Sequence, residues 1–164
     1  MYAYALYKQK FIKEGHEVLR SIYEMCADTQ RAKIYPGIPE YFDSQGRGMY
    51  HYLTGSASWF ILTLLTEVFG VRGEYGDLVL APKLLKEQFS KNGEAQVSLQ
   101  FAGKKLTVVY HNKNKRDYNQ YHIKDLLLNK KSLAFEKISI REARVKREVL
   151  AKANYDSIIQ VILE

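Results

Sequence analysis

The segment GRGMYHYLTGSASWFILTLLTEVFGVRGEYGDLVLAP, residues 46–82, contains the point at which the hydrophobic pattern of the chain changes. Residues 49–69 are apolar on nearly all sides of a helical wheel, which is typical of a helix packed against several others. Gly70 suits the C-cap of this helix. After residues 71–73 the apolar positions recur with a period of about two, which indicates strands. We therefore expect a helical part, residues 1–73, and a β part, residues 74–164.

The chain ahead of this segment begins with an amphipathic pattern. In residues 4–27 apolar or small side chains recur at three- and four-residue steps, which predicts one helix: Phe11, Gly15, Val18, Ile22 and Cys26. No capping residue precedes the pattern, so we expect the natural beginning of this helix to have been removed or to lie on another chain. A loop rich in glycine, proline and aromatic residues follows and leads to Gly46.

The chain after this segment has the alternation of strands. Six segments are predicted to be strands, separated by Asn, Gly and Lys turns: residues 77–81, 95–101, 105–111, 121–128, 133–138 and 157–163. Residues 140–153 fit either a short helix or a further strand, and we favour a strand. This order predicts an antiparallel β-sandwich.

The net charge of +7 is concentrated in the β part. Between Lys83 and Lys152 there are 17 lysines and arginines and 7 acidic residues. A basic half is compatible with a nucleic-acid-binding module. The positive residues are scattered singly or in pairs among apolar residues, however, which favours a solvated face. We therefore expect no nucleic-acid partner.

Other features exclude several classes of function. The first residues lack the pattern of a secretory signal and no run of 18 apolar residues is present, so we expect a cytoplasmic chain without a membrane partner. The single cysteine, Cys26, lies on the apolar helical stripe, which favours a buried thiol over a nucleophile. Four histidines show no metal-ligand spacing, and no glycine-rich nucleotide loop is present. We expect neither a metal nor a cofactor.

Four short motifs occur in a fixed order in the deciding segment. They are Gly46-Arg47-Gly48, the element YLTGSASW at residues 52–59, the element FGVR at residues 69–72, and the strand pattern at residues 75–82. In order and spacing they resemble the end of the catalytic barrel in glycoside hydrolase family 94. The resemblance covers residues 33–84 well, the first helix by position, and the β part by architecture.

The resemblance implies an α+β chain made of the last helices of an (α/α)6 barrel followed by an antiparallel β-sandwich. It also implies an inverting phosphorylase that cleaves β-glucosides with inorganic phosphate to give α-glucose 1-phosphate. In this family an aspartic acid protonates the leaving oxygen and phosphate is the nucleophile. That aspartate precedes the matched segment in the family, so we expect no catalytic residue here and no activity from the isolated chain.

The same resemblance implies that Thr54 and Gly55 hold phosphate, the co-substrate. From these residues alone, the favoured interpretation is that Thr54 is an N-cap and that Gly55 allows close helix packing, and it is the neighbouring motifs that favour phosphate binding. Arg47 either binds phosphate or sugar, or pairs with Glu40 or Asp43. Loop carboxylates usually cap or meet a neighbouring arginine, so an acid and base pair made of Glu40 and Asp43 is disfavoured.

The stretch at residues 34–42, IYPGIPEYF, departs from the element of the smaller phosphorylases. It is more similar to the long members that act on β-1,2-linked glucans. Expected partners are a β-glucan or β-glucoside, phosphate, and either the missing barrel portion or a second copy bound through the helical half. Several aromatic residues are candidates to stack on sugars, although we expect most of them to pack inside the barrel and only one or two to face a cleft: Tyr35, Tyr41, Tyr50, Tyr52 and Trp59. The alternative is a carbohydrate-binding β-sandwich without catalysis, for which the sandwich offers Tyr110, Tyr118 and Tyr121.

Overall fold

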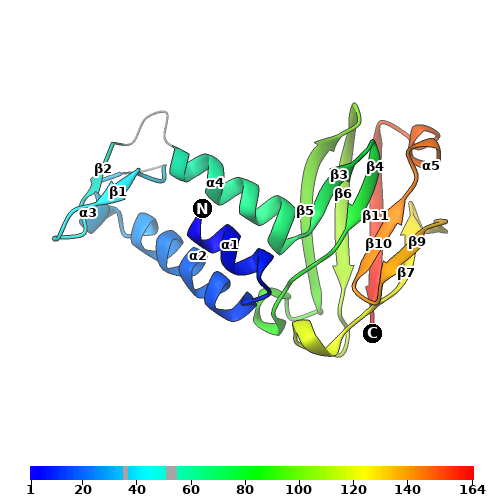
Figure 1. The fold of residues 1–164 in the computed structure, drawn as a ribbon, viewed down its shortest axis with the longest axis horizontal. Coiled ribbons are helices and arrows are strands. Elements are labelled where there is room, and N and C mark those ends of the chain that lie inside the picture. Colours follow the sequence, from blue (N-terminus) through cyan, green and yellow to red (C-terminus); the bar gives the residue numbers. More distant parts are fainter. Residues whose placement is uncertain (35–36, 51–54) are drawn as a thin grey trace. The chain divides into compact units, whose positions relative to one another are not determined.

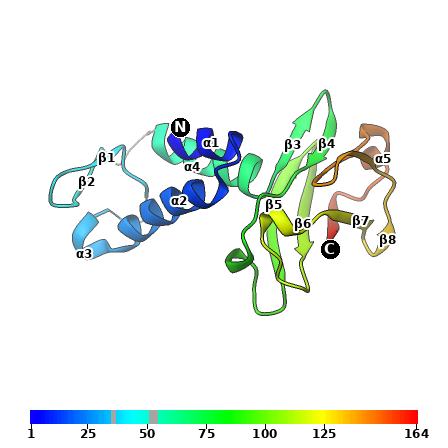
Figure 2. The same ribbon diagram turned by 60° about the horizontal axis from the view of Figure 1, so that its bottom comes forward.

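The structure, a computed structural model, describes residues 1–34, 37–50 and 55–164. The chain is α+β and divides into two compact units, Met1–Glu67 and Val68–Glu164 (Figures 1 and 2). We call them the helical unit and the β unit. The sequence places the change of pattern after residue 73, and strand β3 (Val71–Glu74) extends across that position.

The helical unit contains four helices and a small hairpin among its described residues. They are α1 (Tyr2–Lys8), α2 (Ile12–Ala27), α3 (Thr29–Ala32), β1 (Tyr41–Phe42), β2 (Gly48–Met49) and α4 (Gly55–Thr63), which continues into a π-helical turn (Leu64–Val68). The prediction of a single helix over residues 4–27 is therefore wrong, because two helices occupy this range. Lys10 has a φ of 66°, which interrupts the helix between α1 and α2.

The packing of α1 on α2 explains one residue of the predicted stripe. A Cβ atom on Gly15 of α2 would lie 2.6 Å from the ring of Tyr7 of α1. Tyr7 is completely buried, and burial raises the pKa of its hydroxyl. Gly15 is thus small because the Tyr7 ring packs on the backbone of α2 at this point.

Helix α4 differs from the helix predicted over residues 49–69 in extent and in burial. Met49 belongs to strand β2, and the helix is described from Gly55. Within Gly55–Thr63 only Thr63 is buried, although the segment is apolar on all sides. The expected burial of this helix against several others is therefore not observed among the described residues.

The β unit has two sheets. One has the order β3-β4-β10-β9, with β4 (Asp77–Leu80), β10 (Glu142–Val145) and β9 (Glu136–Ser139). The other has the order β5-β6-β11-β7-β8, with β5 (Glu94–Phe101), β6 (Lys104–His111), β11 (Asp156–Leu163), β7 (Ile123–Leu128) and β8 (Lys131–Ser132). Short helical turns lie at Lys86–Gln88 and Tyr118–Gln120, and α5 (Arg147–Ala151) precedes β11.

Most predicted strands are present, with two differences. Strands β6 and β11 pair in parallel, so the five-stranded sheet is mixed and not purely antiparallel as expected. A parallel pair needs a long crossover, and here β7 to β10 and α5 form it. Residues 140–153 contain both candidates: β10, a strand, is followed by helix α5.

The core of the β unit follows the period of two. Alternate residues of β6 and β11 are buried: Leu106, Val108, Tyr110, Ile159, Val161 and Leu163. The hydroxyl of Tyr121 adds a polar link, since it accepts a hydrogen bond from the Leu84 amide at 2.9 Å and faces the carbonyls of Leu84 and Pro82 at 3.1 and 3.2 Å. These hydrogen bonds hold the segment after β4 to Tyr121, two residues before β7. Burial raises the pKa of the Tyr121 hydroxyl.

Candidate functional site

The Gly46-Arg47-Gly48 motif lies in the turn between β1 and β2, and Asp43 organises that turn. One carboxylate oxygen of Asp43 accepts hydrogen bonds from the amides of Gln45 and Arg47, each at 2.9 Å. Its backbone amide donates to the Arg47 carbonyl at 3.0 Å, and its carbonyl accepts from the Gly46 amide at 3.0 Å. The Asp43 carboxylate is therefore used to fold the turn.

Glycine is required at the two positions of the motif for different physical reasons. Gly46 has a φ of 83°, and a Cβ atom there would lie 2.3 Å from Nε of Arg31, which donates to the Gln45 carbonyl at 3.2 Å. A Cβ atom on Gly48 would lie 2.5 Å from the Ile34 side chain. Both glycines thus permit close contacts that brace the turn from outside, and the sequence offered no signal that Arg31 makes one of them.

The side chain of Arg47 lies between these braced positions and is exposed. Among the described residues its guanidinium has no ion pair or hydrogen bond. In particular, the Asp43 carboxylate bonds to backbone amides of the turn and the Glu40 carboxylate to the Ser56 amide. Of the two predicted alternatives, the structural pairing is therefore not observed. An unpaired guanidinium on a rigid turn is suited to bind an anion or a sugar hydroxyl.

Glu40 lies at the amino end of α4. One carboxylate oxygen of Glu40 accepts from the Ser56 amide at 3.4 Å, and its carbonyl accepts from the Ser56 hydroxyl at 3.1 Å. A carboxylate at this position is stabilised by the helix dipole. Glu40 and Asp43 are thus a helix cap and a turn residue, and not an acid and base pair. No local spacing in the sequence indicated that Glu40 would cap a helix 16 residues away.

The resemblance assigns phosphate binding to two adjacent residues, Thr54 and Gly55. Thr54 lies outside the described residues. Gly55 is exposed, and a Cβ atom on it would have no neighbour within 4 Å. Within the described part of the chain, close helix packing is therefore not the reason for a glycine here, and none of these residues covers the position of a Cβ atom on Gly55. Any anion that binds the first turn of α4 meets the carboxylate of Glu40 as a competitor.

A cavity of about 250 Å³ lies beside this helix start, within the helical unit. Its lining comes from α1, α2, α4 and residues 38–42 and includes Glu40, Ser56, Trp59 and Phe60. The Tyr4 ring packs edge-on against Trp59 at 5.4 Å. The cavity is smaller than the ~300–1,000 Å³ typical of small-molecule sites. Glu40 and Ser56, which bond to each other, place polar groups in its otherwise largely apolar lining.

Only some of the aromatic residues that were predicted to stack on sugars are exposed. The rings of Tyr41 and Tyr50 lie 5.8 Å apart, and the two residues are 50% and 56% exposed. Tyr35 and Tyr52 lie outside the described residues. The three candidates on the β unit are buried and cannot form a binding platform: Tyr110, Tyr118 and Tyr121.

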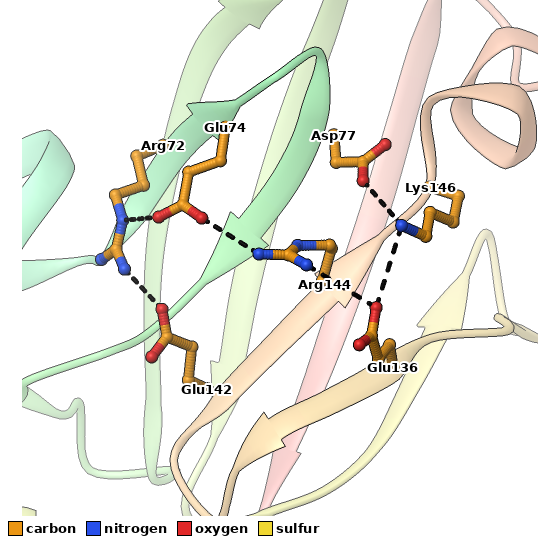
Figure 3. A network of polar contacts seen from close by, with 7 residues as sticks. All are labelled: Arg72, Glu74, Asp77, Glu136, Glu142, Arg144 and Lys146. Atoms are coloured by element: carbon orange, nitrogen blue, oxygen red, sulfur yellow. Dashed lines mark hydrogen bonds and ion pairs between the residues drawn. The ribbon is translucent and has the colours of Figure 1, made fainter.

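A network of charged side chains covers one face of the four-stranded sheet (Figure 3). Arg72 and Arg144 both lie opposite Val79 in the strand register, so these three residues share a face. Val79 is completely buried beneath the network. The network has three cations and four carboxylates: Arg72, Arg144, Lys146, Glu74, Asp77, Glu136 and Glu142.

Glu74 is the central acid of this network. It lies 3.1 Å from Nε of Arg72 and 3.2 Å from a terminal nitrogen of Arg144, and hydrogen bonds to these two residues hold its pKa below the usual value. Lys146 lies 3.1 Å from Asp77, whose pKa is lowered first by the Arg147 amide and then by Lys146. With three cations against four carboxylates, this face has no positive excess, which argues against a nucleic-acid groove here.

Two further expectations concern reactive groups. Cys26 is buried, as predicted, and burial raises the pKa of its thiol, which disfavours a nucleophilic role. Among the described residues no group of three or more His, Cys, Asp or Glu side chains is arranged to hold a metal ion. No helix in the described part of the chain has the length and apolar character needed to cross a membrane.

Comparison with known proteins adds no relative. A scan against protein-family models matches none, and a search of curated proteins gives no significant match. Any function assigned to this chain is therefore a proposal that rests on its residues and their geometry.

Proposed function

We propose that this chain is the carboxyl-terminal part of an inverting glycoside phosphorylase of the glycoside hydrolase family 94 type. The helical unit would supply the last helices of an (α/α)6 barrel, and the β unit would be the β-sandwich that follows. The ordered motifs in residues 46–82 motivate the proposal. One observation supports it most: the braced turn presents the exposed guanidinium of Arg47, which has no partner among the residues that the structure describes.

In the proposed reaction, a phosphate oxygen attacks the anomeric carbon of a β-glucoside on the face opposite the leaving group. The bond from that carbon to the glycosidic oxygen breaks, and an aspartic acid gives its proton to this oxygen. The products are α-glucose 1-phosphate and the shortened glucan. The family places this aspartate in a barrel portion that precedes the matched segment, so the isolated chain is expected to be inactive without that portion.

The role proposed for Arg47 is to bind the phosphate and balance its charge. A guanidinium offers a planar pair of donors that matches two phosphate oxygens, and such charged hydrogen bonds are the stronger class. The role proposed for Gly55, with Thr54, is to present donors at the amino end of α4. Glu40 opposes this second contact, because its carboxylate already accepts the Ser56 amide at 3.4 Å.

Phosphate titration of the ¹⁵N-labelled full chain tests these roles by following the amide resonances of Gly55 and Ser56. Arg47→Ala is expected to weaken phosphate binding about tenfold, as for loss of a charged hydrogen bond. Arg20→Ala is the matched control, since it removes the same charge from α2, where Arg20 pairs with Glu24 at 3.6 Å. Glu40→Gln keeps an acceptor for Ser56 but removes the competing charge, and it is expected to tighten binding.

Two outcomes would contradict this proposal. Equal effects of Arg47→Ala and Arg20→Ala would mean that phosphate responds only to net charge. Unmoved Gly55 and Ser56 resonances at saturating phosphate would mean that the start of α4 binds no anion.

A second candidate function is carbohydrate binding without catalysis, and the exposed Tyr41 and Tyr50 pair favours it. In that case a β-glucan oligosaccharide binds with the same affinity whether phosphate is present or absent. The phosphorylase proposal instead predicts that the two ligands influence each other's binding.

The proposal also includes the partners of the helical unit and the location of the chain. Ile61 and Leu62 of α4 are 52% and 42% exposed, and we propose that the missing barrel portion or a second copy of the chain covers them. A cytoplasmic location is proposed because phosphate and sugar phosphates are intracellular metabolites and the chain has a single cysteine.

A further inference from the structure

A second cavity, of about 440 Å³, lies entirely within the β unit. It is found where β6 and β11, the parallel pair, reach their carboxyl ends beside β7. Eight residues line it: His111, Lys113, Asn114, Lys124, Gln160, Ile162, Leu163 and Glu164. Its size falls in the ~300–1,000 Å³ range of small-molecule sites. None of the motifs in residues 46–82 includes these residues, so the cavity is independent of the proposed phosphorylase function.

One wall of the cavity is held by a chain of hydrogen bonds across three strands. Nδ1 of His111 lies 3.1 Å from the carboxylate of Glu94, and Nε2 of His111 lies 3.2 Å from the side-chain nitrogen of Gln160. In its neutral form His111 donates to Glu94 through Nδ1 and accepts from Gln160 through Nε2. The side-chain carbonyl oxygen of Gln160 has no partner among the described residues, so it remains available to a ligand hydroxyl.

A second wall is formed by a rigid turn after β6. The buried side chain of Asn112 accepts from the Arg116 amide at 3.0 Å and donates to the Arg116 carbonyl at 2.8 Å, and the Asn112 amide donates to the Gly93 carbonyl at 2.7 Å. These bonds fix the backbone that carries Lys113 and Asn114. Within the described part of the chain, neither of these two side chains has a hydrogen bond or ion pair. The turn thus presents an ammonium and an amide to the cavity.

The residues that line the cavity include two lysines and one carboxylate, which is an excess of one positive charge among the lining side chains. Lys124 pairs with Glu164 at 2.7 Å, and Lys113 is left as an unpaired cation among the residues that the structure describes. The Lys124 hydrogen bond and charge, followed by His122 and Arg116, lower the pKa of Glu164. Glu164 is therefore a carboxylate held among positive groups at the edge of the cavity, as a bound anion would be.

We infer that this cavity binds a small anion that carries hydroxyl groups, of the size and chemistry of a sugar phosphate or sugar acid. Lys113 forms an ion pair with the phosphate or carboxylate of the ligand. Lys124 forms a second one when the ligand displaces the Glu164 carboxylate from it. Asn114 and Gln160 supply hydrogen bonds to hydroxyl groups, and Ile162 provides apolar contact. Glu164 acts as an internal competitor for the same positive groups.

The test uses the full ¹⁵N-labelled chain with four probes: glucose 6-phosphate, glucuronate, inorganic phosphate and glucose. The side-chain amide resonances of Asn114 and Gln160 are followed during each titration. Glucose 6-phosphate or glucuronate is expected to shift them and to bind more tightly than both inorganic phosphate and glucose. Whichever anionic sugar binds more tightly supports the inference and identifies its charged group.

Variants with matched controls test the assigned residues. Lys113→Ala is expected to weaken binding about three- to tenfold, whereas Lys137→Ala, which removes the same charge from the exposed strand β9, has little effect. Glu164→Gln is expected to tighten binding by a similar factor, and Glu148→Gln on the exposed face of α5 is its control. Arg47→Ala should leave this binding unchanged, so failure here and failure of the phosphorylase proposal are separate results.

Three results would overturn the inference. One is that Lys113→Ala and Lys137→Ala weaken binding equally, which is the effect of net charge alone. Another is that Glu164→Gln tightens binding no more than Glu148→Gln. The third is that inorganic phosphate binds as tightly as both anionic sugars, because the hydroxyl contacts would then contribute nothing.

Discussion

The two units of the chain satisfy their side chains to different degrees. In the β unit, alternate residues of β6 and β11 are at most 5% exposed, and the charges on the four-stranded sheet are paired. In the helical unit, α4 is apolar on all sides but buries only Thr63 within Gly55–Thr63, and Arg47 has no partner among the described residues. Strands β6 and β11 therefore bury every second side chain in a core, whereas α4 leaves most of its apolar side chains at least partly exposed.

The largest effect on stability is expected from a substitution in the core of the β unit. Leu126 on β7 is completely buried, and Leu126→Ala is expected to lower the free energy of unfolding by about 2–5 kcal/mol. Leu127, the next residue, lies half-buried on the opposite face, so Leu127→Ala should cost less than about 1 kcal/mol. Hydrogen exchange of the β6 and β11 amides measures both, because Trp59, the only tryptophan, reports on the helical unit.

Equal losses for the two leucine variants would contradict this assignment of faces. A loss confined to Trp59 fluorescence, with unchanged exchange in β6 and β11, would mean that Leu126 does not support the core of the β unit.

A smaller effect is expected from the paired charges. Glu74→Gln should lower the stability of the β unit at neutral pH by less than about 1 kcal/mol, because partly exposed ion pairs contribute little. Arg72 and Arg144 lower the pKa of Glu74 in the folded state, so its contribution is present above the unfolded pKa of about 4.3 and is lost as pH falls through the folded pKa. The difference between wild type and variant should therefore shrink below about pH 4.3.

Urea unfolding at a series of pH values measures this difference, with hydrogen exchange as the reporter of the β unit. Glu148→Gln is the control, since Glu148 is exposed and has no ion pair among the described residues. A Glu74→Gln difference that grows as the pH falls would show that the Glu74 carboxylate destabilises the fold, which is opposite to the expected sign.

The sequence predicted the fold where local periodicity determines it. The alternation along β5, β6 and β11 was sufficient to place these strands within one residue of their observed ends. The parallel pairing of β6 with β11 was not predictable in this way, because strand direction depends on a crossover of more than 40 residues. The break between α1 and α2 at Lys10 was missed because the apolar stripe continues across it.

The candidate site was predictable only in part, for a similar reason. The motif located Gly46, Arg47 and Gly48, but it did not show that Arg31 braces the turn or that Glu40 caps α4. These contacts join residues 14 and 16 positions apart. The cavity beside Lys113 was missed because its residues come from β6, the turn after it, β7 and the end of the chain from β11 onward, and share no spacing in the sequence.

The smallest effect on stability is expected in α4, and it sharpens the comparison. Ile61 and Leu62 are exposed, so Ile61→Gln with Leu62→Gln should change the stability of the helical unit by no more than about 0.5 kcal/mol per residue. Trp59 fluorescence during unfolding measures this change.

If the Ile61 and Leu62 side chains mediate self-association, light scattering at micromolar concentration should show an oligomer for the wild type and a monomer for the variant. Ile140→Gln, which removes an apolar residue of the β unit that is 63% exposed, should leave the oligomer intact. A monomeric wild type would contradict self-association through α4. Dissociation by Ile140→Gln would instead place the contact between the copies on the β unit.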